Sequence, residues 1–233
     1  MVLLAIVFDL DDTLYPEHSY VLSGFGAVAA WADANLGIAA DQGFVELRSL
    51  FEGGVRGNTF NIWLEGHGLA SESSVRKLTQ VYREHLPGIE PYPGTVELLE
   101  QLRPDYVLGL LTDGYVAAQR KKLAALGLRS YLTDALFTGS YGDGAGKPSS
   151  RVFRIILGRL GVAGGEAIYV GDNPMKDFLG ARRAGMGTVR VRAREGIYFD
   201  REPPTSAHAP DYEVGDLPSL TQVLPRFTTA RTS

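Results

Sequence analysis

The chain opens with an apolar run that ends abruptly in acidic residues. Residues 2–8 read Val-Leu-Leu-Ala-Ile-Val-Phe, and Asp9, Asp11 and Asp12 follow at once. An apolar stretch without alternation is typical of a strand covered on both faces, as in a parallel sheet flanked by helices. Ligands of such sheets bind beyond the carboxyl ends of the strands. We therefore expect an α/β fold whose chemistry lies where this first strand ends.

The acidic residues at this junction require a positive partner. Asp9 and Asp11 are two residues apart, so both carboxylates reach one crevice if the backbone turns there. Crowded carboxylates raise each other's pKa unless a cation or a proton intervenes. A divalent metal ion is the simplest partner for this pair.

Composition narrows the class of protein. The chain has 233 residues, of which 45% are hydrophobic and 21% charged, which is typical of a soluble globular protein with one core and a smaller appendage. A formal net charge of -4 argues against nucleic acid as a partner, whereas a small phosphorylated molecule can still bind through local charge and backbone amides. The sequence has no cysteine, which excludes disulfides and thiolate metal sites.

The opening apolar run is not typical of a targeting segment. It lacks a basic flank, it is too short to span a bilayer, and it finishes in three acids within residues 9–12. We expect a cytoplasmic protein without a membrane partner. The pattern indicates no particular oligomeric state.

The order of apolar patterns predicts a discontinuous core domain with an insertion. Residues 16–90 have helical periodicity, whereas helices and strands alternate from residue 91 onward, which predicts a parallel sheet with right-handed crossovers. We expect a core of residues 1–15 and 91–233 and an inserted helical domain of residues 16–90. The expected core helices cover 94–102, 117–126, 150–160 and 175–184 with a short last helix, and the later strands cover 106–112, 135–138, 167–170, 188–191 and 211–214.

Polar residues also follow other expected strands. Residues 112–114 read Thr-Asp-Gly, and residues 171–177 read Gly-Asp-Asn-Pro-Met-Lys-Asp. Between them, Gly146-Lys147-Pro148 places a lysine just ahead of a helix. One edge of the sheet would thus carry carboxylates, a hydroxyl, a fixed cation and a glycine that lets backbone amides approach a phosphate.

These four segments, in this order, resemble the haloacid dehalogenase superfamily of phosphohydrolases. The resemblance matches residues 9–14 to the first motif, Thr112 to the second, Lys147 to the third, and Gly171-Asp172 with Asp177 to the fourth. It covers residues 1–15 and about 91–192 closely. It implies a Rossmann-like parallel sheet with helices on both faces, and residues 16–90 are similar to the helical cap (the C1 cap of subfamily I) inserted after the first motif.

The resemblance implies a role for each catalytic residue. Asp9 would be the nucleophile that forms an aspartyl-phosphate, and Asp11 would give a proton to the leaving alcohol and later take one from water. This double role of Asp11 calls for a pKa near the working pH. Thr112 and Lys147 would neutralise and position the phosphoryl oxygens, and Lys147 would also pair with Asp9.

The resemblance also implies a magnesium site and a phosphate site. Asp9, the backbone carbonyl of Asp11, and Asp172 would hold Mg²⁺, and Asp177 would hold a metal-bound water or a neighbouring ligand. Thr112 and the amide of Asp113 would donate hydrogen bonds to the substrate phosphate, and Gly114 and Lys147 would also bind it. Asp12 and the carboxylate of Asp113 are expected to be structural.

Other charged residues fit the pattern less directly. Arg56 lies in a glycine-rich break of the insertion, where contact with substrate and a solvated loop position are equally compatible with the sequence. His18 follows the first motif closely enough to reach a substrate, but a structural role is the favoured interpretation. Lys176 competes with Lys147 for the role of the fixed cation, but the setting between glycine and proline favours Lys147, and Lys176 is expected on a helix surface. The alternating arginines 190, 192 and 194 are expected on one solvated face.

The most favoured function is a phosphomonoesterase of small phosphorylated metabolites that uses Mg²⁺. A sugar phosphomutase or a dehalogenase of the same family is the first alternative, although dehalogenases need no acid to protonate a halide and commonly lack one two residues after the nucleophile. A receiver-like signalling module, with its phosphorylated aspartate, magnesium, threonine and lysine, is the alternative of another class. Sugar phosphates, nucleotides and small organic phosphates all remain open as substrates.

Overall fold

The computed structural model describes residues 2–142 and 144–229, and these form one six-stranded parallel sheet in the order β3-β2-β1-β4-β5-β6. The predicted α/β class with a parallel sheet is confirmed. The strands are β1 (Ala5–Phe8), β2 (Val107–Thr112), β3 (Asp134–Phe137), β4 (Ala167–Gly171), β5 (Gly187–Val191) and β6 (Tyr212–Val214).

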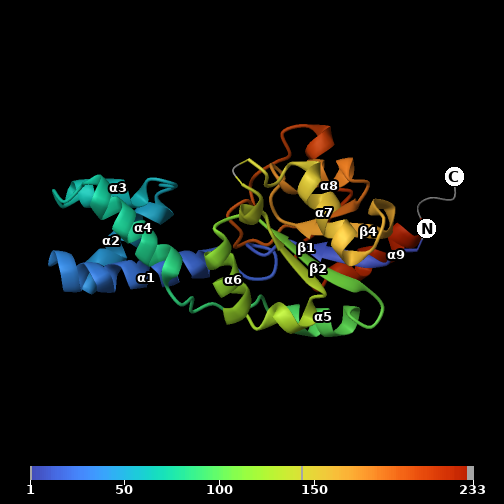
Figure 1. The fold of residues 1–233 in the computed structure, drawn as a ribbon, viewed down its shortest axis with the longest axis horizontal. Coiled ribbons are helices and arrows are strands. Elements are labelled where there is room, and N and C mark those ends of the chain that lie inside the picture. The colour runs from blue at the N-terminus through green and yellow to red at the C-terminus, as the bar shows by residue number, and fades with distance from the viewer. Residues whose placement is uncertain (1, 143, 230–233) are drawn as a thin grey trace. The chain divides into compact units, whose positions relative to one another are not determined.

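Helices α7 and α8 cover one face of the sheet, and α5 and α6 cover the other (Figure 1). The α-helices from residue 95 onward are α5 (Thr95–Leu102), α6 (Val116–Ala125), α7 (Ser150–Leu160), α8 (Asp177–Arg183) and α9 (Leu220–Thr229). Because crossover helices lie on both faces, the internal strands β2, β4 and β5 are largely buried, as the continuous apolar runs predicted, whereas the edge strand β3 is mostly half-buried.

Strand β1 occupies the middle of the sheet. Its residues pair with β2 on one side and β4 on the other, so Ala5 lies beside both Val107 and Ala167. All four residues of β1 are buried, whereas Val2 is 67% exposed, so the strand is shorter than the apolar run. The amide of Asp9 still donates to the carbonyl of Val170 at 2.8 Å. The first acidic residue is therefore held directly at the carboxyl edge of the sheet.

The core between the sheet and α7 is packed by apolar side chains that alternate along the strands. Ala5 and Val7 point to the same face as Tyr169, and Phe153 of α7 meets the Tyr169 ring edge-on at 5.0 Å. Full burial of a side chain such as Phe153 contributes about 1.5–3 kcal/mol. This packing fixes β1 and β4 against α7 and so fixes the ends of both strands.

The expected element boundaries differ from the observed ones most clearly at α8. This helix begins at Asp177 rather than at residue 175. The side chain of Asn173 accepts a hydrogen bond from the amide of Met175 at 2.9 Å, which forms a turn before the helix. The turn leaves Asp177 in the first helical turn, pointing back toward the end of β4.

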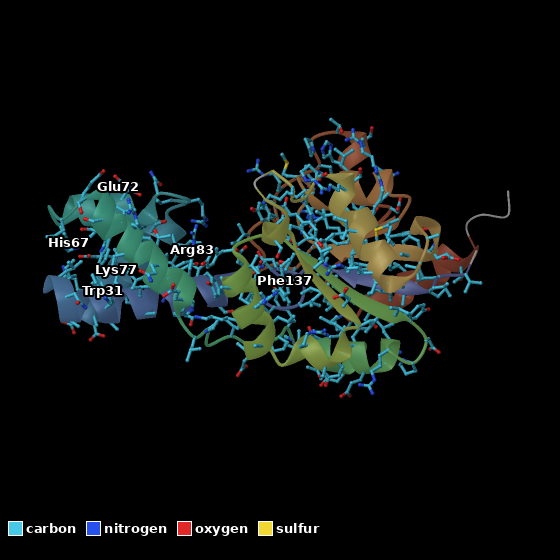
Figure 2. All side chains as sticks on the ribbon, in the orientation of Figure 1. Trp31, His67, Glu72, Lys77, Arg83 and Phe137 are labelled. Carbon is cyan, nitrogen blue, oxygen red and sulfur yellow. The ribbon has the colours of Figure 1, made fainter. Side chains whose placement is uncertain are left out.

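The chain divides into two compact units, one of Met1–His18 with Glu90–Ser233 and one of Ser19–Ile89. The second unit, called here the helical unit, is built from α1 (Glu17–Leu36), which begins in the first unit, and from α2 (Ala40–Glu52), α3 (Thr59–Gly66) and α4 (Glu72–Glu84). Its interior is aromatic, since Phe25 packs against Phe51 and Phe60 at centroid distances of 6.1 and 6.3 Å. At its surface, Lys77 lies 5.9 Å above the Trp31 ring (Figure 2).

Across residues 2–142 and 144–229, no helix has the length and apolar character needed to cross a bilayer.

Candidate active site

Three buried carboxylates meet at the carboxyl edge of the sheet. Asp9 follows β1, Asp172 follows β4, and Asp177 lies in the first turn of α8. One oxygen from each carboxylate lies within 4.8 Å of the others. Because β1 and β4 are neighbours, residues 163 positions apart in the sequence come together here. The structure thus places three of the four predicted metal ligands in one cluster.

A glycine makes room for this cluster. A Cβ atom added at Gly171 would lie 2.5 Å from Oδ2 of Asp177, which is closer than such atoms approach in proteins. That same Oδ2 accepts a hydrogen bond from the amide of Asn173 at 2.8 Å. Gly171 therefore allows the Asp177 carboxylate to fold back under the strand end.

Lys147 is the cation at the centre of the cluster. Its Nζ lies 2.8 Å from Asp9 Oδ1, 2.8 Å from Asp177 Oδ1 and 2.9 Å from the hydroxyl of Tyr169. Burial by itself lowers the pKa of Lys147, but the negative charges of Asp177 and Asp9 outweigh it and raise that pKa well above its ordinary value. The lysine is therefore a permanent positive charge, as a phosphate-binding role requires.

One lysine does not neutralise three carboxylates. The pKa of Asp9 is raised to about 7, mainly by burial, with the charges of Asp177 and Asp11 adding to the rise and Lys147 opposing it. Burial, with the charges of Asp177 and Asp9, also raises the pKa of Asp172 well above its ordinary value. The cluster therefore favours an additional cation.

The donor set fits a hard divalent cation. All three candidate side chains offer carboxylate oxygens, which are the ligands that Mg²⁺ prefers. The Oδ2 atom of Asp172 is buried and has no hydrogen-bond partner among the residues that the structure describes. A buried acceptor without a donor is costly, and a metal ion would satisfy it.

A cavity of about 210 Å³ opens beside these carboxylates. Thr112, Asp113 and Gly114 line it from the end of β2, so the predicted phosphate-binding segment reaches the same space as Asp9 and Lys147. The full lining consists of Asp9, Asp11, Glu17, Thr112, Asp113, Gly114, Lys147, Asp172, Asn173, Lys176 and Tyr198. Lys176 is exposed, as expected, but it also contributes to this lining.

The carboxylate of Asp113 has the structural role that the sequence suggested. Its Oδ1 accepts hydrogen bonds from the Thr138 hydroxyl at 2.7 Å and from the Lys147 amide at 3.1 Å. A Cβ atom at Gly146 would lie 2.7 Å from this oxygen, so the preceding glycine is needed for the contact. Asp113 thereby fixes the backbone that carries Lys147.

Asp11 has a different electrostatic setting from the three clustered carboxylates. Its side chain forms an ion pair with Lys122 and accepts a hydrogen bond from Gln119, two α6 residues that the sequence interpretation did not single out. Burial by itself raises the pKa of Asp11, but Lys122 and the hydrogen bonds outweigh it and lower that pKa below its ordinary value. The expected pKa near the working pH is therefore wrong for this arrangement, because a buried lysine stabilises the ionised form.

Glu17 and Tyr198 are further cavity residues that the motifs did not indicate. The pKa of Glu17 is raised to about 8, mainly by burial, with the charges of Asp11, Asp12 and Asp9 adding to the rise and Lys122 opposing it. Tyr198 comes from the segment after β5. Tyr198 lies outside every motif in the sequence, so no sequence pattern indicated that it would line the cavity.

The expectation that Arg190 lies on a solvated face is wrong. Arg190 is fully buried, because β5 is an internal strand that pairs with both β4 and β6. Its guanidinium donates to the carbonyl of Asp172 at 3.0 Å and to the carbonyls of Tyr198 and Arg201 at 2.8 and 2.9 Å. Arg190 therefore links the end of β4 to the segment that carries Tyr198.

The remaining candidates are Asp12, His18 and Arg56. Asp12 is buried and accepts hydrogen bonds from the amides of Glu17 and Ile197 at 2.8 and 2.7 Å, in agreement with a structural role. His18 is half-buried and is not one of the described residues that line the cavity. In the helical unit, the Arg56 guanidinium lies 3.7 Å from the Phe51 ring and donates to the carbonyl of Val55 at 2.9 Å. A role of Arg56 toward substrate stays a prediction.

Comparison with protein families gives a match over most of the chain. Residues 3–185 match the model of the haloacid dehalogenase-like hydrolases. This range contains all four predicted motif segments.

Two characterised relatives and one solved structure illustrate the similarity. The chain is 33% identical over 218 residues to a glyceraldehyde 3-phosphate phosphatase of Methanopyrus kandleri, which covers 90% of this chain and 92% of the relative. It is 36% identical to a phosphoserine phosphatase of Thermus thermophilus, over 85% of this chain and 68% of the relative. The crystal structure of the hydrolase YfnB from Bacillus subtilis superposes with a TM-score of 0.71 at 21% identity, over 96% of this chain and 99% of that one, which supports the fold.

Proposed function

The chain belongs to the haloacid dehalogenase-like hydrolases, and we propose that it is a magnesium-dependent phosphomonoesterase that acts through an aspartyl-phosphate on Asp9. The observation that carries this proposal is the arrangement around Asp9. Its carboxylate borders a cavity, lies 2.8 Å from a buried lysine and shares an oxygen cluster with two further carboxylates. A nucleophile, a fixed cation and metal ligands therefore meet at one point, as phosphoryl transfer requires.

In the first step, a carboxylate oxygen of Asp9 forms a bond to phosphorus. The bond between phosphorus and the ester oxygen breaks, and its electron pair stays on the leaving oxygen. Lys122 favours the ionised form of Asp11 before substrate binds, so Asp11 takes up its proton with the phosphate ester, whose negative charge favours the protonated carboxyl group. Asp11 then gives this proton to the leaving oxygen, and the product leaves as an alcohol. Both carboxylates line the same cavity, which supports their action on one bound ester.

In the second step, water attacks the phosphorus of the aspartyl-phosphate. Asp11, now ionised, takes a proton from the water while the bond between phosphorus and Asp9 breaks. Asp9 returns to its carboxylate form and inorganic phosphate is released. Splitting the hydrolysis in this way replaces one difficult displacement by two easier ones.

The remaining cavity residues bind and orient the phosphoryl group. Lys147 supplies a permanent positive charge, and the Thr112 hydroxyl with the amides of Asp113 and Gly114 would donate hydrogen bonds to its oxygens. Asp9, Asp172 and the backbone carbonyl of Asp11 would hold Mg²⁺, with Asp177 beside them. When bound, the ion would offset negative charge on the carboxylates and on the phosphoryl oxygens.

We assign substrate selection to the helical unit, as a cap. The relatives named above act on glyceraldehyde 3-phosphate and phosphoserine, so we propose small organic phosphates with short carbon chains as the substrate class. Arg56 is our candidate for a contact with the anionic or polar end of such a substrate. Its guanidinium is exposed and is stacked on Phe51, which limits its conformational freedom.

Asp11 favours ester hydrolysis over dehalogenation. A halide leaves without a proton, whereas an alkoxide needs an acid within reach, and Asp11 lines the cavity beside Asp9. Membership of a hydrolase family also favours an enzyme over a receiver module.

The proposal is tested by the release of inorganic phosphate from a panel of esters. The panel contains 4-nitrophenyl phosphate, phosphoserine, glyceraldehyde 3-phosphate and a nucleoside monophosphate, each assayed with millimolar Mg²⁺ and with EDTA. We expect turnover with Mg²⁺ only and a marked preference within the panel. Absence of phosphate release from every ester by the folded protein with Mg²⁺ would refute the proposal.

A further inference from the structure

The side chain of Asp11 is anchored by two residues of α6 that the reaction described above does not use. Lys122 Nζ lies 2.6 Å from Asp11 Oδ1, and Gln119 Nε2 donates to Asp11 Oδ2 at 2.7 Å. The hydroxyl of Tyr15 also donates to Oδ1. Both oxygens of this carboxylate are therefore held in place.

The position of these two residues is unusual for their type. Lys122 is 5% exposed and Gln119 is 3% exposed, whereas lysine and glutamine on a helix are mostly solvated. They are three residues apart, so they share the face of α6 that also buries Leu123. Burying an ammonium group is costly unless a good ionic partner satisfies it, and Asp11 is such a partner.

Gln119 also connects Asp11 to the phosphate-binding end of β2. Its Nε2 lies 2.6 Å from the hydroxyl oxygen of Thr112, to which it donates a second hydrogen bond. The side-chain amide of Gln119 therefore donates hydrogen bonds to both the Asp11 carboxylate and the Thr112 hydroxyl. Since α6 begins only four residues after Thr112, the helix and the strand end are fixed relative to each other.

We propose that Lys122 and Gln119 are positioning residues that aim the Asp11 carboxyl group at the leaving oxygen of the substrate. The inference rests on the proposed function and adds to it a part that no motif residue supplies. Lys122 keeps its proton throughout, and no bond to Lys122 or Gln119 forms or breaks in either step. Proton transfer is sensitive to placement, since an error of about 1 Å can cost on the order of a hundredfold in rate.

Esters with different leaving groups distinguish a misplaced Asp11 carboxyl group from a general loss of structure. A nitrophenolate departs readily without a proton, whereas an alkoxide needs one from Asp11. Asp11 also acts in the second step, which is the same for every ester, so the comparison uses kcat/KM, which reports only the steps up to release of the alcohol. Loss of correct placement should lower kcat/KM for alkyl phosphates and leave kcat/KM for 4-nitrophenyl phosphate nearly unchanged. A general structural defect would lower both.

The experiment compares Lys122→Met with the neighbouring Lys121→Met, which removes the same charge from the adjacent position of α6. We expect Lys122→Met to lower kcat/KM for a short alkyl phosphate such as glycerol phosphate by about 10- to 100-fold and kcat/KM for 4-nitrophenyl phosphate by less than about threefold. We expect Lys121→Met to change both by less than about twofold. In an Asp11→Asn background, Lys122→Met should give no further loss on the alkyl ester.

Two further variants test the proposal independently if Lys122→Met does not fold. Lys122→Arg keeps the charge but alters its geometry, and it should show the same selective loss on the alkyl ester to a smaller degree. Gln119→Leu removes the hydrogen bonds to both Asp11 and Thr112, so it should lower activity on the alkyl ester more than on 4-nitrophenyl phosphate, with some loss on both. Folding is checked by the melting temperature and the circular dichroism spectrum. Equal losses on the two esters, or full activity on the alkyl ester in folded Lys122→Met, would overturn the positioning proposal. A wild-type protein that hydrolyses neither ester would instead overturn the proposed function and this inference with it.

Discussion

The two ends of the central sheet carry cavities of different size and different chemistry. The cavity at the amino ends of β4, β5 and β6 has a volume of about 360 Å³, and the one at the carboxyl ends of β1, β2 and β4 has about 210 Å³. The larger one is bordered by apolar groups such as Phe227 and by the partly exposed pair Arg182–Asp211 at 3.3 Å. The smaller one is bordered by the buried Asp9, Lys147 and Asp172.

This contrast shows that buried charge, rather than hollow volume, marks the functional end of the sheet. A half-exposed ion pair such as Arg182–Asp211 contributes little to stability, at most about 1 kcal/mol. Buried carboxylates without enough cations raise the free energy of the folded state, and such an arrangement is retained at sites that bind a ligand. Substitutions at the carboxyl edge are therefore expected to change the catalytic rate and the stabilisation by metal, and substitutions at the amino edge are expected to change neither.

The largest expected effect is the loss of turnover on substitution of the nucleophile. Asp9→Asn should reduce kcat for 4-nitrophenyl phosphate by about 10³-fold or more, because the amide cannot attack phosphorus. The matched change at the amino edge, Asp211→Asn, should leave kcat within about twofold while lowering stability by about 1 kcal/mol through its hydrogen bonds to Thr188. Similar losses of kcat in the two variants would break the contrast between the edges.

The next effect in size is stabilisation by magnesium. Mg²⁺ at 100 times its Kd should stabilise the folded protein by about 2.7 kcal/mol and so raise the melting temperature by several degrees. Asp172→Asn should remove most of this shift, since Asp172 offers a buried oxygen without a donor, whereas Asp211→Asn should keep it. Calorimetry that finds the same shift in both variants would place the ion elsewhere.

The carboxyl edge of the sheet is proposed to carry out the reaction, whereas the helical unit is proposed to select the substrate. Arg56→Ala should raise KM for the preferred member of the ester panel by about fivefold, which corresponds to about 1 kcal/mol, and leave kcat for 4-nitrophenyl phosphate unchanged. Arg48→Ala, which removes another exposed arginine of the same unit, is the control. An equal change of KM in the two variants would show that Arg56 does not contact the substrate.

The smallest effect concerns the pH dependence of stability without metal. The pKa of Glu17 is raised to about 8 when folded, so the folded state holds a proton between about pH 4.5 and 8 that the unfolded state has lost. Stability of the wild type should therefore fall with rising pH across this window relative to Glu17→Gln. Urea unfolding in EDTA at pH 5 and pH 8 measures the difference between the two proteins, and a constant difference would contradict the shift.

The sequence predicted the parts of the site that lie at strand ends. Asp9, Thr112 and Asp172 follow apolar runs, and a parallel sheet brings such ends to one edge whatever their separation in the chain. Lys147 could be placed because a lysine between glycine and proline just ahead of a helix is held near that edge. Family motifs then predicted a role for each of these residues.

Other site residues could not be placed from local pattern. Gln119 and Lys122 lie in a helix whose polar residues read as solvated, and only their shared face with Leu123 hinted at burial. Arg190 was misassigned because alternation along β5 does not reveal that another strand covers its edge. Tyr198 reaches the cavity from an irregular segment, whose path depends on tertiary contacts rather than on periodicity.

The most direct test of the central claim is to trap the covalent intermediate on Asp9. The enzyme is mixed with substrate and Mg²⁺, quenched within one turnover and treated with borohydride, which reduces an aspartyl-phosphate to homoserine. We predict that peptide mass spectrometry finds homoserine at position 9, and only when substrate is present. Phosphate release with position 9 unmodified, or with the modification at another aspartate, would contradict Asp9 as the nucleophile.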